Sequence, residues 1–416
     1  MFSSSPFSHA VVPLTNRYLI AVLTLLCVTV HGQPRPAPDD SPRGTNTQFY
    51  EAFKVGDTIP GDLKFYRDTR ELVPANEIFQ KAYTVIVSGC LTCGQFRITY
   101  PIVEAVYRDY KDQDVNFFFV YQTLQHPENH SYVQAFSMEE RFLQLEVAKK
   151  EYGTTVPWVL DTFDNNWKAY FQLHPNSEIT FDREGKMVHA EPWVRQPKLR
   201  NAMEKLFGPV EHPTRVSDLD LPEIERLGNG DRTGVVERVK VSGVAVPISF
   251  TLQESKQTYY AKLRPEVDRS LYDSGNGQMY IGLHLDPIYQ VHWNNNSEPV
   301  TYQLKLPEGV TASPIQGKGV LPDVETDKDP REFLIDIENW TARDEPIGID
   351  VFYFACNKAE GWCNPVKQSY LIHLERDRLQ GTVHGRTHQV DNYWLHPVDP
   401  HWPCTFLCQQ TDQTRP

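Results

Sequence analysis

Two patterns of hydrophobic and polar positions divide this chain. From about residue 49 to 207, short apolar runs alternate with segments of helical periodicity. From about residue 234 to 378, regularly spaced apolar runs are separated by turns rich in Pro, Gly and Asn. The first pattern predicts alternating strands and helices, and the second predicts an antiparallel β-sandwich without helical stretches. We therefore expect an α/β region followed by an all-β region.

The α/β region is expected to begin with a short hairpin near 63–66 and to end with a hairpin and a helix. The apolar run 115–121 is continuous, which indicates a strand buried on both faces. Strands are predicted at 83–88, 115–121, 155–160, 178–182 and 186–189, and helices at 94–111, 138–152, 166–171 and 196–207. This alternation with a terminal hairpin is a thioredoxin-like layout.

The all-β region follows an interdomain linker at 208–233, which contains a turn-rich joint at 228–231. Its strands are predicted at 235–241, 246–252, 258–263, 278–285, 289–294, 300–306, 332–337, 347–355 and 369–374. Short, evenly spaced strands of this kind indicate an antiparallel β-sandwich.

Cys90 and Cys93 form a Cys-x-x-Cys motif between the predicted strand 83–88 and helix 94–111. Unpaired N–H groups and the helix dipole favour a thiolate at such a junction, and a second cysteine three residues on closes a short disulfide. A buried structural pair and half of a zinc site are the alternatives. Zinc needs a second Cys/His pair nearby, and this segment has none. We expect a redox pair, with Cys90 at the helix start favoured as the attacking thiol.

The N-terminus is typical of an export signal. A 12-residue apolar run at 19–30 follows Arg17, and it is shorter than a membrane span needs. We expect a signal peptide at 1–32, a flexible linker at 33–48 and a mature protein that is periplasmic or secreted and not integral to the membrane. Six cysteines then remain in three close pairs, as an oxidising compartment favours.

The net charge of −13 and the absence of basic tracts argue against binding to nucleic acid or anionic membranes. Aromatic residues make up 12% of the chain, which is enough for sizeable cores.

The segment 49–207 resembles the thioredoxin/peroxiredoxin superfamily and, within it, the iodothyronine deiodinase family and its bacterial relatives. The matching segments are 92–96 around the selenocysteine position, Tyr121 with His126-Pro127, 160–165, Ala169-Tyr170 and Pro175. The resemblance places Cys93 where the family has selenocysteine. It implies reductive dehalogenation or thiol peroxidase chemistry at Cys93 as alternatives to disulfide exchange.

Two further residues are candidates in this region. Val156-Pro157 resembles the cis-proline turn that faces the cysteines in thioredoxin folds, with a structural trans proline as the alternative. His126 is a candidate for tuning or protonating a thiol-derived group, and an exposed loop histidine is the alternative.

The all-β segment 234–378 resembles the immunoglobulin-like N-terminal domain of DsbD-type thiol:disulfide interchange proteins. The matching segments are 279–287, 289–293, 306–310 and 353–365. The resemblance implies that Cys356 and Cys363 relay electrons from a membrane donor. A structural hairpin disulfide is the alternative.

The tail 379–416 holds a set of residues of metal-ligand type. His384 and His388 form His-x3-His, and Cys404 and Cys408 form Cys-x3-Cys. Adventitious metal binding and a Cys404–Cys408 disulfide are the alternatives, and no cofactor is required by the rest of the chain.

We therefore predict an exported thiol–disulfide oxidoreductase that acts through Cys90 and Cys93. Its expected partners are protein thiols or disulfides, a small thiol or a halogenated substrate, and a membrane electron donor. A non-catalytic envelope binding protein with structural disulfides remains the alternative from another class.

Overall fold

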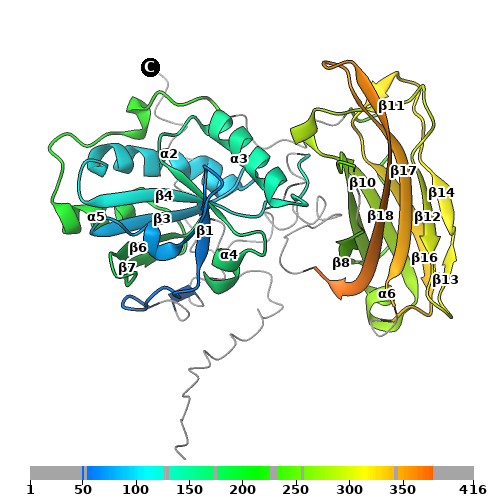
Figure 1. The fold of residues 1–416 in the computed structure, drawn as a ribbon, viewed down its shortest axis with the longest axis horizontal. Helices are drawn as coiled ribbons and strands as arrows, with labels where there is room; N and C mark the ends of the chain where they lie inside the picture. Colours follow the sequence, from blue (N-terminus) through cyan, green and yellow to red (C-terminus); the bar gives the residue numbers. More distant parts are fainter. Residues whose placement is uncertain are drawn as a thin grey trace, which may run out of the picture. The chain divides into compact units, whose positions relative to one another are not determined.

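The computed structural model describes residues 49–50, 54–125, 127, 131–171, 176–224, 233–253, 257–341 and 345–377. They form an α/β region and an all-β region, labelled in Figure 1. The expected signal peptide, the linker 33–48 and the tail lie outside the described residues.

The α/β region is built on one seven-stranded sheet in the order β2-β1-β5-β4-β3-β6-β7. Its strands are β1 (Lys64–Arg67), β2 (Leu72–Pro74), β3 (Tyr83–Gly89), β4 (Val115–Tyr121), β5 (Trp158–Asp161), β6 (Glu178–Asp182) and β7 (Met187–Glu191). The three central strands β3, β4 and β5 run parallel, whereas β6 is antiparallel to β3 and β7 is antiparallel to β6. The hairpin β1–β2 extends the other edge through an antiparallel pairing of β1 with β5. This order, with helices between the parallel strands, is thioredoxin-like, as the sequence predicted.

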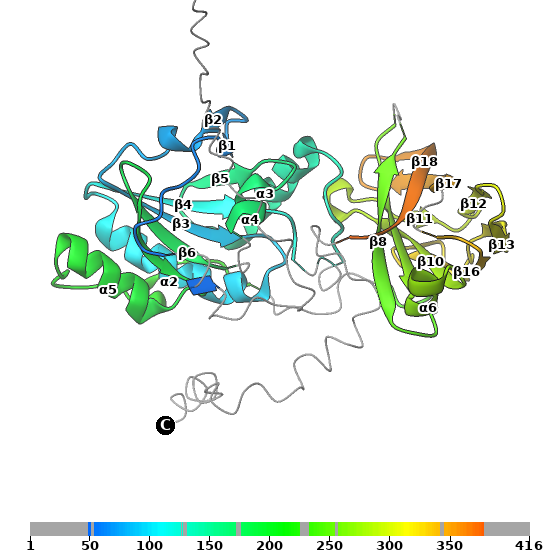
Figure 2. The ribbon, with the colours of Figure 1, turned by 90° about the horizontal axis from the view of Figure 1, so that it is seen from below.

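The helices cover both faces of this sheet. They are η1 (Ala75–Glu77), α2 (Gly94–Tyr110), α3 (Met138–Tyr152), α4 (Asn166–Phe171), α5 (Gln196–Phe207) and η3 (Val216–Asp218). Apolar residues of α2, α3 and α5 share one core with one face of β3, β4 and β5, and α2 lies beside α5 (Figure 2). Residues of α4 and η1 belong to the core on the opposite face. The alternating side chains of β4 therefore enter two cores, which is why its sequence is apolar throughout.

Local signals set the ends of α3 where the sequence predicted them. Ser137 is the N-cap, and its hydroxyl accepts a hydrogen bond from the Glu140 N–H. Gly153 ends the helix in the left-handed conformation with φ of 57°, which glycine adopts without strain.

The all-β region contains one continuous antiparallel sheet of nine strands, in the order β13-β16-β10-β9-β8-β18-β17-β12-β14. Its elements are β8 (Ala245–Leu252), β9 (Ala261–Asp268), α6 (Arg269–Ser274), β10 (Gly277–Leu285), η4 (Pro287–Tyr289), β11 (Trp293–Asn294), β12 (Thr301–Lys305), β13 (Thr311–Ser313), β14 (Gln316–Lys318), β15 (Thr326–Asp327), β16 (Arg331–Glu338), β17 (Ile347–Asn357) and β18 (Trp362–Arg376). The short strands β11 and β15 pair separately.

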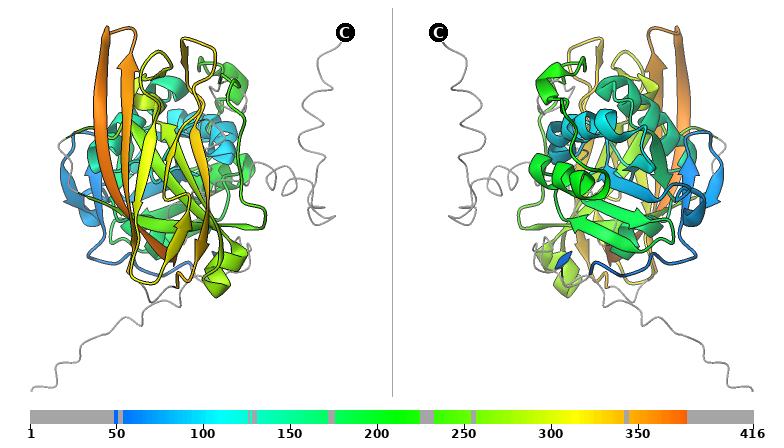
Figure 3. Two further views of the ribbon diagram at one scale, coloured as in Figure 1. Left: turned by 90° about the vertical axis from the view of Figure 1, so that its right-hand side faces the viewer. Right: turned by 90° about the vertical axis from the view of Figure 1, so that its left-hand side faces the viewer.

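Strand β8 connects the two layers of this region. Its first half pairs with β9 and its second half with β18, so one strand belongs to both layers. Apolar residues of β10 and β16 on one side, and of β17 and β18 on the other, enclose a shared core. The left-hand view of Figure 3 shows these strands. The predicted antiparallel β-sandwich is confirmed.

The predicted strand 289–294 is a strand only at Trp293–Asn294, and residue 289 belongs to η4. Two further predictions for this region are wrong. Residues 235–241 form no strand, because the backbone N–H groups of Val235 and Val236 bind the Asp329 carboxylate and that of Val239 binds Glu332. The region also contains a helix, α6, which begins where the Asp268 side chain accepts the Leu271 N–H. An aspartate cap of this kind starts a helix even in a chain dominated by strands.

Within the described residues, no helix is both long enough and apolar enough to cross a membrane.

Candidate functional site

Cys90 and Cys93 lie in the turn that joins β3 to α2, and both are free thiols. The Cys93 N–H donates to the Cys90 carbonyl at 3.4 Å, which closes the turn. Such a turn brings the first and fourth Cα atoms within about 7 Å, the separation that a disulfide spans. Gly89 permits this close junction, because a Cβ there would lie 2.4 Å from the ring of Phe96.

Cys93, not Cys90, occupies the start of the helix. It is the N-cap of α2, and its sulfur accepts the Phe96 N–H at 3.4 Å. The helix begins at Gly94, as predicted, so Cys90 precedes its first turn. The expectation that Cys90 lies at the helix start is wrong. Both cysteines are buried, since Cys90 is 0% exposed and Cys93 is 3% exposed.

The sulfur of Cys90 is bound by the loop that follows β4. The Gln125 N–H donates to Cys90 Sγ at 3.3 Å, and Thr92 Oγ1 lies 3.7 Å from the same sulfur. Thr92 Oγ1 also donates to the Gln125 carbonyl at 2.5 Å. The Gln125 residue is therefore tied to the cysteine turn through both its N–H and its C=O.

Helix α3 holds the other side of the turn. The Tyr152 hydroxyl lies 3.1 Å from the Cys90 carbonyl and 3.0 Å from that of Leu91, and it donates to both. The turn is thus fixed by hydrogen bonds from the segments after β4 and at the end of α3. No sequence pattern pointed to Tyr152 or Gln125, because their contacts are 62 and 35 residues away along the chain.

Burial controls the acidity of both thiols. Loss of solvent raises the pKa of Cys90 and of Cys93 above the ordinary value, and hydrogen bonds from Gln125 and Phe96 only partly oppose this. Burial also lowers the pKa of Lys168 in α4 to about 8. The electrostatic effect of Cys90 acts in the opposite direction and raises this pKa. In this reduced state both cysteines are therefore thiols at neutral pH.

Pro157 does not form the predicted cis turn. The Val156–Pro157 bond is trans, and Ser313–Pro314 is the cis bond among the described residues. The trans form, which is the favoured isomer, leads directly into β5, and the Pro157 carbonyl accepts the Phe119 N–H of β4 at 2.9 Å.

The segment beside the cysteine strand on its antiparallel side is Asn176–Ser177, which the sequence did not single out. The Ser88 N–H donates to the Ser177 carbonyl at 3.0 Å, two residues before Cys90. Strand order, rather than any motif, places it there, since β6 pairs directly with β3.

Several predicted site residues cannot be placed. His126, His384, His388, Cys404 and Cys408 lie outside the described residues. Within the described ranges, no group of three or more His, Cys, Asp or Glu residues is arranged to hold a metal.

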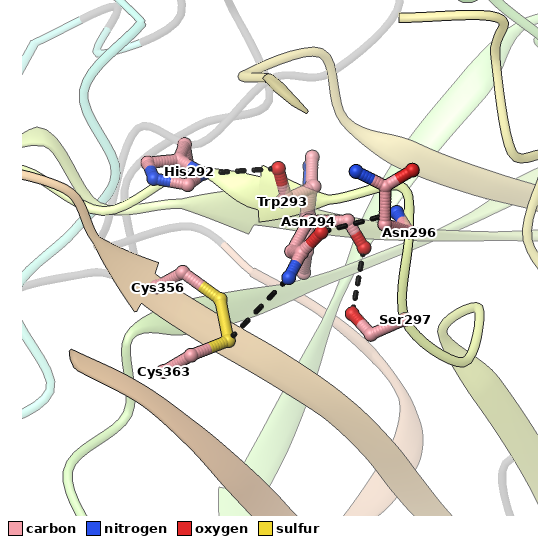
Figure 4. Close-up of a disulfide and its surroundings, with 7 residues drawn as sticks. All are labelled: His292, Trp293, Asn294, Asn296, Ser297, Cys356 and Cys363. Atoms are coloured by element: carbon pink, nitrogen blue, oxygen red, sulfur yellow. Dashed lines mark hydrogen bonds between the residues drawn. A yellow bond between two sulfur atoms is a disulfide. The ribbon is translucent and has the colours of Figure 1, made fainter. Parts of the chain in front are cut away.

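Cys356 and Cys363 form a disulfide across the hairpin β17–β18, where they are directly opposed. Cys356 is buried and Cys363 is exposed. Asn294 lies beside the bond with its side-chain nitrogen 3.9 Å from Cys363 Sγ, and His292 pairs through its backbone with Cys356 (Figure 4). The two cysteines thus differ in access to a thiol from solution.

No family model matches this chain, and no curated protein matches it. Solved structures are similar to its α/β region. A thiol:disulfide interchange protein from Bacteroides sp. shares 20% identity over 38% of this chain and 94% of its own, with a TM-score of 0.31. The thioredoxin domain of a thiol-disulfide oxidoreductase from Bacteroides vulgatus shares 20% sequence identity over 37% of this chain and 98% of its own, with a TM-score of 0.29. An uncharacterized conserved protein from Geobacillus kaustophilus shares 20% sequence identity over 39% of this chain and 88% of its own, with a TM-score of 0.30. The fold assignment rests on the strand order given above.

Proposed function

We propose that this protein is a thiol–disulfide oxidoreductase whose redox pair is Cys90 and Cys93. The observation that carries the proposal is the placement of two free cysteines in one turn between β3 and α2, with the second capping the helix. Helix N-termini favour thiolates, so this position lowers the cost of ionising Cys93 when solvent or substrate reaches it.

The reaction transfers two electrons from the cysteine pair to a substrate disulfide. The Cys93 thiolate attacks one substrate sulfur, the substrate S–S bond breaks, and one substrate thiolate leaves and takes up a proton. The Cys90 thiolate then attacks Cys93 Sγ in the mixed disulfide. The second substrate thiolate leaves, and a Cys90–Cys93 disulfide remains. The N-cap position of Cys93 supports this residue as the first attacking thiol, although the sequence favoured Cys90.

Insulin reduction by the full chain with a dithiol tests the activity. We expect turnover in the wild type and none in Cys90→Ser or Cys93→Ser. Cys90→Ser should accumulate a mixed disulfide through Cys93, because its resolving thiol is gone. A wild-type protein that reduces no disulfide substrate with any of a range of reductants would contradict the proposal. Peroxide consumption or halide release that needs Cys93 and not Cys90 would favour the alternative chemistries at Cys93.

A second proposal concerns the β-sandwich. In its observed disulfide the residue Cys363 is exposed and Cys356 is buried, which favours thiol exchange at Cys363. We propose that Cys356 and Cys363 pass electrons, received from a membrane donor, to Cys90 and Cys93. The test is trapping: Cys90→Ser with Cys356→Ser should yield a Cys93–Cys363 disulfide under mild oxidation. If the Cys356–Cys363 disulfide is purely structural, no cross-link should form in this variant or in any other variant that keeps one cysteine of each pair.

Export to the periplasm or the exterior remains part of the proposal, as do the domain boundaries. An oxidising compartment suits the Cys356–Cys363 disulfide. Fractionation of cells that express the full chain tests export. Limited proteolysis, with cleavage expected within 208–233, tests the domain boundaries.

A further inference from the structure

The Thr92 hydroxyl gives no proton to the Cys90 sulfur in the reduced state, although the backbones of Gln125 and Thr92 also hydrogen-bond this sulfur. The Thr92 hydroxyl carries a single proton, and that proton is used by the Gln125 carbonyl at 2.5 Å. Thr92 therefore presents an oxygen lone pair to Cys90 Sγ, 3.7 Å away. In the reduced state the Cys90 S–H donates to Thr92, while the sulfur accepts the Gln125 N–H. This buried thiol is fully satisfied.

Ionisation of Cys90 changes the hydrogen bond that its sulfur can make with Thr92, because the sulfur no longer carries a proton to donate. A thiolate is an acceptor only, so the lone pair of Thr92 Oγ1 would face a negative sulfur. Rotation of the hydroxyl about its C–O bond turns the proton to the sulfur and ends its bond to the Gln125 carbonyl. A hydrogen bond to an anion is stronger than one to a neutral carbonyl, so the rotation is favourable.

We propose that Thr92 is a positioning residue whose hydroxyl proton lies on the Gln125 carbonyl while Cys90 is a thiol and turns to the Cys90 sulfur when this cysteine ionises. The inference deepens the proposed function, in which Cys90 acts as the resolving thiolate. The Cys90 proton leaves to solvent or to the departing substrate thiolate, and Thr92 only rotates its own. In this way the residue between the cysteines supplies a donor at the moment it is needed.

Other titratable groups also face this sulfur. They are Tyr121 from β4, Tyr152 from α3, Lys168 from α4 and Cys93 at the start of α2. Thr92 is hydrogen-bonded to both the Cys90 sulfur and the Gln125 carbonyl. A change at Thr92 should therefore be separable from their influence.

The test is the pH dependence of alkylation at Cys90 in the full chain with Cys93→Ser. Mass spectrometry of peptide 82–97 isolates this thiol from the other cysteines. Adding Thr92→Val should raise the midpoint by about one pH unit, which lowers the rate below the midpoint about tenfold. Thr92→Ser keeps the hydroxyl, so its alkylation rate below the midpoint should stay within about twofold of the rate in the Cys93→Ser parent.

Thr84→Val is the matched control, because its buried hydroxyl bonds the Ile78 carbonyl and does not contact the cysteines. It should leave the midpoint unchanged. A midpoint unaltered by Thr92→Val, or shifted equally by Thr92→Ser, would overturn the inference. Because alkylation needs no substrate disulfide, these outcomes are independent of whether insulin is reduced.

A second measurement needs no variant at Thr92. Gln125-His126 is the only Gln-His step in the chain, so carbonyl-¹³C glutamine with ¹⁵N histidine labels this one peptide for NMR. The Gln125 carbonyl resonance should shift with the same midpoint as Cys90 alkylation, since the carbonyl loses its hydroxyl donor. A carbonyl resonance that stays constant through the titration would contradict the rotation.

Discussion

The carboxylate of Glu104 accepts two hydrogen bonds from Thr155, at 2.9 Å from its N–H and 2.7 Å from its hydroxyl. The same fully buried carboxylate accepts from the Thr154 hydroxyl at 2.6 Å and from Arg108 at 2.9 Å. Glu104 thus joins the middle of α2, the helix capped by Cys93, to the loop that leads into β5. A buried acid with this many donors stabilises the fold only while it is ionised.

Glu104→Gln should destabilise the protein by about 2 kcal/mol, because an amide places donors against Thr154 and Thr155 and leaves a buried group unpaired. Urea unfolding measures the change. Glu146→Gln is the control, since Glu146 is exposed and its ion pair with Lys149 lies at the surface. Equal stability of the two variants would contradict the role of Glu104.

The contribution of Glu104 should also depend on pH. Burial acts to raise its pKa, but the hydrogen bonds from Thr154, Thr155 and Arg108 outweigh burial and hold the pKa below the ordinary 4.5. The folded state therefore releases this proton more readily than the unfolded state. The stabilisation is present above about pH 4.5 and is lost as the pH falls through the folded-state pKa. Unfolding free energies measured from pH 7 to pH 3 should fall more steeply in the wild type than in Glu104→Gln.

Tyr152→Phe should loosen the cysteine turn. It removes the hydroxyl that bonds the carbonyls of Cys90 and Leu91, at a cost of about 1 kcal/mol. Alkylation of Cys90 and Cys93 should become about fivefold faster if opening of the turn limits access. Tyr110→Phe removes a similar bond, to the Gly208 carbonyl, away from the cysteines. It should cost comparable stability and leave the alkylation rates unchanged.

Sequence periodicity predicted the α/β region closely because its elements are locally specified. Strand 115–121 and helices 138–152, 166–171 and 196–207 have the predicted bounds. The site was harder to predict, since the partners of Cys90 come from other elements. Gln125 binds through its backbone, which any residue type provides, so its identity carries no signal.

The failures in the all-β region have a similar origin. The valine-rich run 235–241 is typical of a strand, yet three of its N–H groups are bound by carboxylates from residues 329 and 332. Such long-range pairings are not encoded in a local pattern.

The Cys356–Cys363 bond should stabilise the β-sandwich as well as serve exchange. It closes a loop with a sequence separation of 7, for which restricting the unfolded chain contributes about 2 kcal/mol. Replacing both cysteines with serine should lower the unfolding free energy by this amount. Because Cys363 is exposed, mild dithiol should open the bond in the folded protein. Resistance of the bond until the protein unfolds would favour a purely structural role and weaken the relay proposal.

The central claim is that Cys90 and Cys93 cycle between two thiols and one disulfide while the protein stays folded. Fully reduced protein is incubated with glutathione disulfide across a series of glutathione ratios, and peptide 82–97 is analysed by mass spectrometry. We expect a reversible loss of two hydrogens within this peptide that follows a single reduction potential, with near-UV circular dichroism retained. A pair that never forms the internal disulfide, or forms it only in the unfolded protein, would contradict the account.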